Sequence, residues 1–258
     1  MKTIPGRVLT GLCAAATLAV ASAAAQSPDV KEKAPMYTYV ANWTIPRAKW
    51  AAMEKENATT DKTLDHDLTA GALLGYGDDV NLVHTAEGAT HDGWWSGKSL
   101  AAVLGVLDEF YKAGSVASAA LESATKHWDG LYISRFYNWR AGSYKGAYTR
   151  VSAYKLRADA PADAVETIAK AFAVPLLEKL LADGAVVEYE IDEESIHTES
   201  PDMFWIEFIT PNAEGLDKAN AELREALRAS PFFAPAFHSM VDYSQHRDYL
   251  LRTDATYK

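Results

Sequence analysis

Residues 71–85 read GALLGYGDDVNLVHT and residues 184–198 read GAVVEYEIDEESIHT, so one segment recurs with a shift of 113 positions. Gly71 matches Gly184, Tyr76 matches Tyr189, and the segments close on matching His-Thr pairs. Self-similarity at a fixed offset is the sequence signature of an internal repeat. The rest of the chain should therefore divide into two equivalent halves.

Matches outside this segment keep the same order along the chain. They pair Tyr37-Thr38 with Tyr148-Thr149, Trp94 with Trp205, and His127 with His238. We place the first half at residues 36–140 and the second at residues 147–258. The stretch 138–145, which contains Gly142, is the predicted link.

Hydrophobic periodicity predicts the order β, α, β, β, α, β in each half. In the second half we expect strands over 148–156, 185–198, 203–210 and within 236–251, and helices over 161–181 and 212–229. Pro175 should kink or split the first of these helices. In the first half we expect strands over 36–45, 72–85, 91–95 and 130–139, helices over 46–55 and 99–112, and an extra helical segment over 116–126.

One βαββαβ unit forms a four-stranded antiparallel sheet with both helices on one face, so its other face must be covered. Two units in one chain can cover each other. In this order of elements the sequence resembles the fused, tandem-repeat members of the dimeric α/β-barrel superfamily, an α+β class with ferredoxin-like halves. The superfamily includes haem-degrading and cofactor-free monooxygenases, chlorite dismutases, dye peroxidases, lactone isomerases and stress-induced proteins. The resemblance therefore implies a fold rather than one reaction.

The first residues read as an export signal. Lys2 and Arg7 precede an apolar stretch, and Ala23-Ala24-Ala25 offers small residues for cleavage. We predict a signal peptide over 1–25 and a periplasmic or secreted protein. The single cysteine, Cys13, would leave with this segment, which excludes disulfides and thiol chemistry. The net charge of −10 argues against nucleic acid as a partner, and no later apolar run is long enough for membrane insertion.

A strictly alternating strand supplies the candidate chemistry. Glu188, Glu190 and Asp192 share one face, while the other face is apolar. If the acidic face meets the partner sheet, the carboxylates line an enclosed cavity together with Trp205 and Glu207. Burial and mutual repulsion would then raise a pKa into the range of a general acid or base. The alternative is an acidic face at an open edge, solvated by water.

Histidines and aromatic residues leave further alternatives open. His84 and His197 end matching strands and could ligate haem or a metal or act as bases, or they could cap a hairpin. His127 and His238 carry the same ambiguity, and no metal-binding spacing is present. Clusters such as Trp94-Trp95 could line a pocket for a planar ligand or simply pack the core. The basic, aromatic stretch 135–146 could bind an anionic group or neutralise nearby acids.

The sequence thus predicts a small-molecule-binding protein with its pocket between the two sheets, either a cofactor-independent oxygenase-like or an isomerase-like enzyme. Glu190 would be the acid or base and His197 a proton carrier, with Tyr189 beside them. Other ligand-binding residues would be Trp205, Glu188, Asp192, Glu207, His84, Tyr76 and Trp94. The alternatives are a non-catalytic binding or structural, stress-related module, whose barrel would be filled with apolar side chains, and a haem protein. Further association into a homo-oligomer is left open.

Overall fold

The computed structural model describes residues 32–85, 88–198, 201–231 and 233–258. The predicted signal peptide, residues 1–25, lies outside the described residues. The first half contributes the strands β1 (Met36–Thr44), β2 (Leu73–Asn81), β3 (His91–Gly97) and β4 (Lys126–Trp139). The second half contributes β5 (Gly142–Lys155), β6 (Glu188–Glu194), β7 (Met203–Thr210) and β8 (Arg247–Tyr257).

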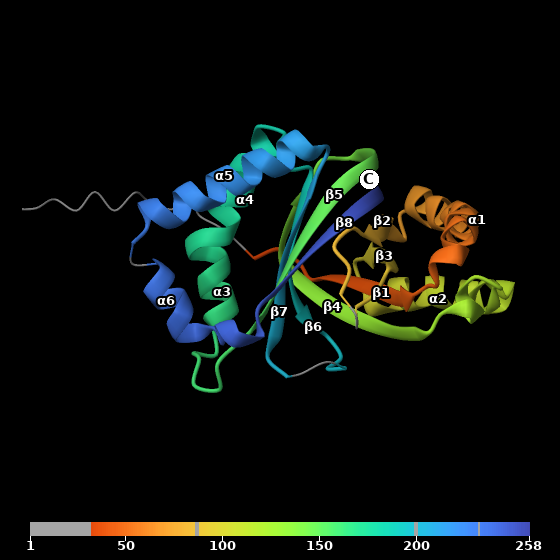
Figure 1. Cartoon of the computed structure of the whole chain (residues 1–258), viewed down its shortest axis with the longest axis horizontal. Helices are drawn as coiled ribbons and strands as arrows, with labels where there is room; N and C mark the ends of the chain where they lie inside the picture. Colours follow the sequence, from red (N-terminus) through yellow and green to blue (C-terminus); the bar gives the residue numbers. More distant parts are fainter. Residues whose placement is uncertain (1–31, 86–87, 199–200, 232) are drawn as a thin grey trace, which may run out of the picture.

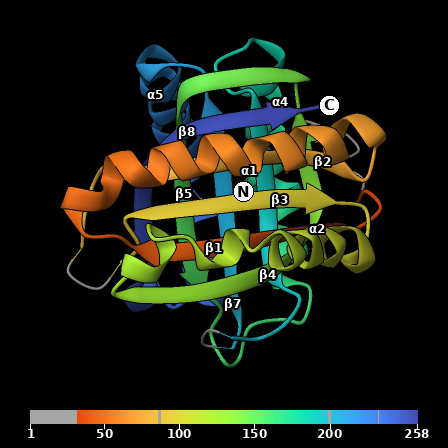
Figure 2. The same cartoon turned by 90° about the vertical axis from the view of Figure 1, so that its right-hand side faces the viewer.

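The eight strands close into one antiparallel barrel in the order β1-β3-β2-β8-β5-β7-β6-β4. Two seams join the halves: β2 pairs with β8, and β4 pairs with β6. In Figure 2 the strands of the first half cross those of the second. The predicted α+β fold, two ferredoxin-like units that pair their sheets, is confirmed.

Helices cover the outside of the barrel (Figure 1). The helices α1 (Trp50–Ala70) and α2 (Leu100–Ala113) lie on the first half, and α3 (Ala164–Ile168), α4 (Val174–Ala182), α5 (Ala213–Ala229) and α6 (Phe233–Met240) on the second. Within the described residues, none of these helices is long and apolar enough to cross a membrane.

Local signals explain most helix ends. The side chain of Ser99 caps α2 and that of Asn212 caps α5, and each accepts a backbone N–H three residues further on. Gly71 ends α1 with a φ of 82°, a left-handed conformation that glycine adopts without a Cβ clash. A π-helical turn, Ala169–Ala173, separates α3 from α4 just before Pro175, which agrees with the predicted interruption.

Several predicted elements are wrong. The helix expected over 46–55 continues instead to Ala70. The prediction ended it too early because the polar middle of the helix shows no apolar stripe, and only Met53, Leu64 and Leu68 bury apolar side chains. The segment 116–126 forms two short 3-10 turns rather than a helix. The last strand begins only at Arg247, since Phe237 and Met240 pack at helical spacing in α6. The stretch 138–145 does connect the two halves, but most of it is strand: β4 ends at Trp139 and β5 begins at Gly142, and these two strands do not pair with each other.

The hydrophobic core has an outer layer in each half, between helices and sheet. In the second half, α3, α4 and α6 pack against β6 and β7 through side chains such as Ile168, Leu180 and Phe204. In the first half, α1 and α2 pack on β1–β3 through a smaller set that includes Leu73, Trp95 and Val103. The inner faces of both sheets are left to meet inside the barrel.

Candidate functional site

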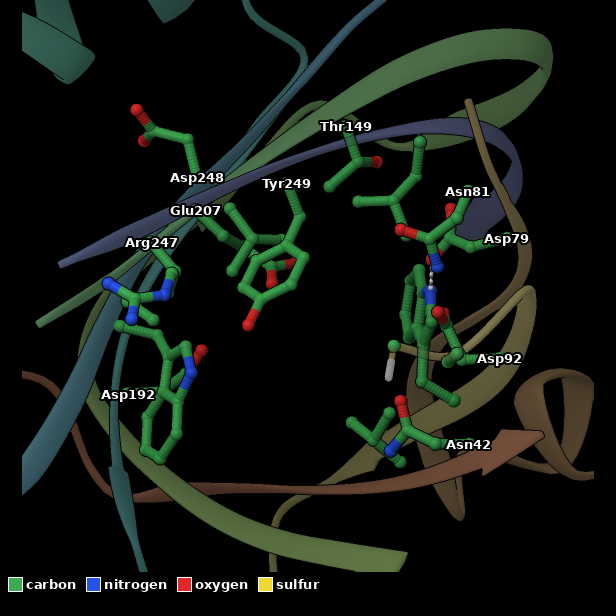
Figure 3. Close-up of a pocket in the computed structure, with 18 of the residues that line it drawn as sticks. Asn42, Asp79, Asn81, Asp92, Thr149, Asp192, Glu207, Arg247, Asp248 and Tyr249 are labelled. Carbon is green, nitrogen blue, oxygen red and sulfur yellow. Dashed lines mark hydrogen bonds between the residues drawn. The ribbon is translucent and has the colours of Figure 1, made fainter. Parts of the chain in front are cut away.

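The barrel encloses a cavity of about 660 Å³, which we call the lumen. Strands of both halves line it (Figure 3). A separate apolar cluster inside the barrel includes Trp94, Tyr257 and Trp139, whose rings stack in sequence at centroid distances of 5.6 and 5.7 Å. Exposed lining residues such as Val83, Arg247 and Asp248 mark where the lumen opens to solvent.

Carboxyl groups dominate the polar lining of the lumen. Strand alternation turns five of them inward, and four have at most 7% of their surface exposed. The five are Asp79, Asp92, Glu190, Asp192 and Glu207. Glu188 is fully buried, and neither of its carboxyl oxygens has a hydrogen-bond partner among the described residues. Burial raises the pKa of Glu188 and of Glu207 well above the usual value, and neighbouring carboxylates add to the effect.

One carboxyl pair lies on the wall of the first half. Asp79 and Asp92 are joined by a side-chain hydrogen bond. Asp79 also accepts from the Thr253 hydroxyl and, at 3.0 Å, from the indole Nε1 of Trp94. Burial raises the pKa of Asp79 to about 6, although these donors oppose the rise. Burial and the charge of Asp79 also raise the pKa of Asp92 well above its usual value.

A second pair, Glu190 and Asp192, lies on the wall of the second half. The Ser134 hydroxyl donates to Asp192 and, at 3.3 Å, to Glu190. The Thr38 hydroxyl donates to Glu190 at 3.4 Å. Burial raises the pKa of Asp192 to about 6 and that of Glu190 well above its usual value. Both carboxyl groups of this pair therefore hold their protons more tightly than exposed carboxyl groups do.

The two pairs are related by the duplication. Asp79 and Asp192 are 113 positions apart, the shift of the repeat. Each lies at a seam of the barrel and accepts from a hydroxyl of the other half, Thr253 for Asp79 and Ser134 for Asp192. The sequence analysis missed Asp79, although Asp79 is the residue of the first half that aligns with Asp192 in the repeat. Asp92 offers no such signal, because its repeat match falls on a different residue type.

The structure brings together part of the predicted site. Glu190, Asp192, Glu207, Trp205 and Trp94 all line the lumen. Glu188 lies on the same face of β6 but is not part of the lining.

Two predicted tyrosines lie elsewhere. Tyr189 and Tyr76 point to the helix side of their strands, where their hydroxyls donate to Glu178 and Asp65, each at 2.6 Å. Placing Tyr189 beside Glu190 in one pocket was wrong, because successive residues of a strand face opposite sides.

The predicted histidines also lie outside the lumen. β2 ends at Asn81 and β6 at Glu194, so His84 and His197 follow in exposed loops, and neither lines the cavity. His84 packs on Trp50 with a centroid distance of 5.5 Å. A proton relay from Glu190 to His197 has no support in this geometry. His238 lies in α6 and stacks on Tyr243. His127 lies in β4.

A second cavity of about 320 Å³, the helix-side pocket, lies between α1, α2 and the sheet of the first half. Its walls include Trp43, Phe110, and Tyr39 stacked on Trp95 at 4.7 Å. The His127 Nδ1 donates to the carbonyl of Asn42 at 2.9 Å, and its Nε2 lies 3.4 Å from Asp129. In the second half, the side chains of the larger core cluster occupy the matching layer between helices and sheet.

Haem and metal ions fit the lumen poorly. No histidine occurs among the described residues that line it, and its carboxylates would repel the propionates of a haem. Among those lining either cavity, only His127 of the helix-side pocket offers an imidazole, so haem stays an alternative for that pocket alone. In the part of the chain that the structure describes, no three His, Cys, Asp or Glu side chains are grouped closely enough to hold one metal ion.

Comparison with known proteins identifies the fold. No family model matches the sequence, and no curated protein matches it. Among solved structures, a candidate monooxygenase from Lactobacillus acidophilus superposes with a TM-score of 0.56 at 12% identity, over 87% of this chain and 97% of that chain. A candidate monooxygenase from Fusobacterium nucleatum does so with a TM-score of 0.56 at 6% identity, over 88% and 95%. The chain therefore has the fold of the dimeric α/β-barrel proteins, with both halves fused in one polypeptide.

Proposed function

We propose that this protein binds a small molecule in its lumen and that the two carboxyl pairs exchange protons with it. The observation that carries the proposal is that two buried, hydrogen-bonded carboxyl pairs, Asp79–Asp92 and Glu190–Asp192, face one cavity of about 660 Å³. A raised pKa near the working pH is what a general acid or base needs.

The chemistry best suited to such pairs is isomerisation. A carboxylate on one wall takes a proton from the ligand, and a carboxyl on the other wall returns a proton at a different atom of it. The ligand then changes its bonding and the total number of protons on the protein is unchanged. Exchange with water carries the extra proton from the first wall to the second, so that both pairs regain their starting state. Oxygenation, suggested by the names of the two similar structures, would start with the same deprotonation and would consume dissolved O₂.

A purely structural barrel receives less support. Such a barrel would fill its interior with apolar side chains, whereas the lumen presents carboxyl, amide and hydroxyl groups. A binding protein without catalysis would use the same lumen. Turnover of a bound compound separates these two functions.

We further propose that the protein acts outside the cytoplasm, on the basis of the charged, apolar and small-residue regions of residues 1–25. The N-terminal sequence of the protein recovered from the periplasm or medium of its host tests this. Recovery of the uncleaved chain from the cytoplasm would contradict it.

A thermal-shift screen of small molecules tests the lumen site, because a ligand that binds only the folded state raises the unfolding temperature. Val151→Phe, which extends a ring into the lumen, should abolish the shift. Ala141→Trp, in the exposed β4–β5 turn, is the matched control and should retain it. Each variant is first checked for an unchanged unfolding temperature without ligand.

The helix-side pocket is the second candidate site, favoured by its aromatic walls and by the hydrogen bond between Tyr39 and Asp129. It suits a planar apolar ligand. Leu107→Trp should fill this pocket and leave the lumen open. Compounds that no longer raise the unfolding temperature of Leu107→Trp but still raise that of Val151→Phe would overturn the lumen proposal.

A further inference from the structure

The lumen contains more negative charge than the protein neutralises. Arg247 is the one lysine or arginine among the described residues that line it, and its Nη1 donates to the backbone carbonyls of Ser244 and His246. Apart from Arg247, no lysine or arginine among these lining residues is available to neutralise a carboxyl group of either pair when it ionises. A buried charge without a counter-charge is costly, so a cation in the lumen would relieve both walls.

These charges are arranged in two groups rather than one. Figure 3 shows Asp79 and Asp92 on one side of the cavity and Asp192 on the other. One member of each group corresponds in the repeat, Asp79 to Asp192, whereas Glu190 corresponds to Gly77. The absence of any three-group metal site among the described residues fits this separation. Two separated anionic walls suit an extended ligand with a positive group at each end.

Unused hydrogen-bonding capacity also points into the lumen. The side-chain amide of Asn81 is 6% exposed, lines the cavity and forms no hydrogen bond with the described residues. Buried polar groups of this kind are normally satisfied by a partner. Asn81 lies beside the Asp79 pair in Figure 3, so a donor bound to that pair would also reach its carbonyl oxygen.

Aromatic side chains line the lumen beside each carboxyl pair: Trp94 donates to Asp79, and Trp205 is the cross-strand partner of Asp192. Trp94 and Trp205 correspond in the repeat, and both line the lumen with Tyr132. Their rings offer an apolar surface for a methylene chain and a π face for an ammonium group. The indole Nε1 of Trp94 is already bound to Asp79, which holds that ring in place.

Resting on the lumen site proposed above, we infer that the ligand is an organic dication of the diamine or polyamine class. One protonated amine binds the Asp79–Asp92 pair and the other binds the Glu190–Asp192 pair. The chain between them lies along the two tryptophans. Such a ligand supplies two positive charges to a cavity whose lining holds several carboxyl groups and one arginine.

Isothermal titration of the full chain at neutral pH tests the inference. The probes are putrescine, cadaverine and 1,6-diaminohexane, with n-butylamine as the single-charge control, 1,4-butanediol as the neutral control and calcium chloride as the metal control. At least one diamine should bind with an affinity at least tenfold above that of n-butylamine, and the diol should not bind. Asp79→Asn and Asp192→Asn should each weaken diamine binding at least tenfold, whereas the exposed Asp159→Asn should leave it unchanged.

Several other outcomes would contradict either the inference or the lumen function on which it rests. Equal binding of diamine and monoamine, preference for calcium, or binding that survives both lumen substitutions would overturn the inference. Circular dichroism and unfolding temperature confirm that each variant is folded. If the small-molecule screen instead yields a neutral or anionic compound that Val151→Phe blocks, the dication is wrong and the lumen function stands. If Val151→Phe blocks no compound at all, the lumen function itself fails.

Discussion

Asp79 and Asp192 occupy matching positions in the two halves, and burial raises the pKa of each to about 6. An unfolded aspartate titrates near pH 4. The folded state therefore holds these protons more tightly than the unfolded chain. As pH rises from about 4 to about 6, the unfolded chain ionises first, so stability falls across that window and the loss is complete above it.

Asp79→Asn should make the free energy of unfolding depend less on pH across this window. Asparagine can still accept from Thr253 through its carbonyl oxygen, and it has no proton to lose. Its amide nitrogen replaces the oxygen that accepts from Trp94, and the loss of that bond lowers stability at every pH without changing the slope. Relative to the parent chain, we expect the variant to gain stability between pH 4 and pH 7, by up to about 3 kcal/mol for two pKa units. Urea unfolding at a series of pH values measures it. Asp159→Asn, an exposed change, should leave the slope almost unaltered, and parallel profiles for parent and Asp79→Asn would rule the idea out.

At the scale of the elements, the two halves resemble each other more in the capping residues of their helices than in the lengths of their helices and strands. Ser99 and Asn212 are 113 positions apart and cap the equivalent helices α2 and α5. Strand β7 and the end of α5 follow the prediction from periodicity. α1 and β8 do not, because the polar run of α1 shows little periodicity and the apolar spacing before β8 belongs to a helix.

The cap of α5 gives a prediction at this scale. The Asn212 side chain accepts from the Gly215 N–H at 2.9 Å. Asn212→Ala should lower the free energy of unfolding by about 1 kcal/mol, while Asn212→Asp should keep most of it, because an aspartate accepts the same bond and favours a helix N-terminus. Urea unfolding compares the three chains. Equal losses in both variants would show that the cap is not the cause.

The whole molecule depends on the closure of two sheets into one barrel. The seams β2–β8 and β4–β6 are built from strands of different halves, and each seam holds one of the repeated aspartates. Neither half could keep its inner face covered if the other unfolded. The halves should therefore unfold together.

Hydrogen exchange measures this coupling. Val103 in α2 is completely buried, and Val103→Ala should destabilise the protein by about 2 kcal/mol. In low denaturant, amide protection should fall by a similar factor in β3 of the first half and β7 of the second. Loss of protection confined to the first half would mean that the two units are independent domains.

The repeat and the strand alternation are properties of the chain itself, so the sequence alone determined the two-unit α+β architecture and the shared face of Glu188, Glu190 and Asp192. Contacts between residues far apart in the chain depend on how the barrel closes. Only the tertiary structure therefore paired Asp79 with Asp92 beside Thr253, left His84 and His197 in loops, and opened a helix-side pocket in the first half. Alternation repeats every two residues along a strand, whereas closure joins residues as far apart in the chain as Ser134 and Asp192, 58 positions, and Asp79 and Thr253, 174 positions.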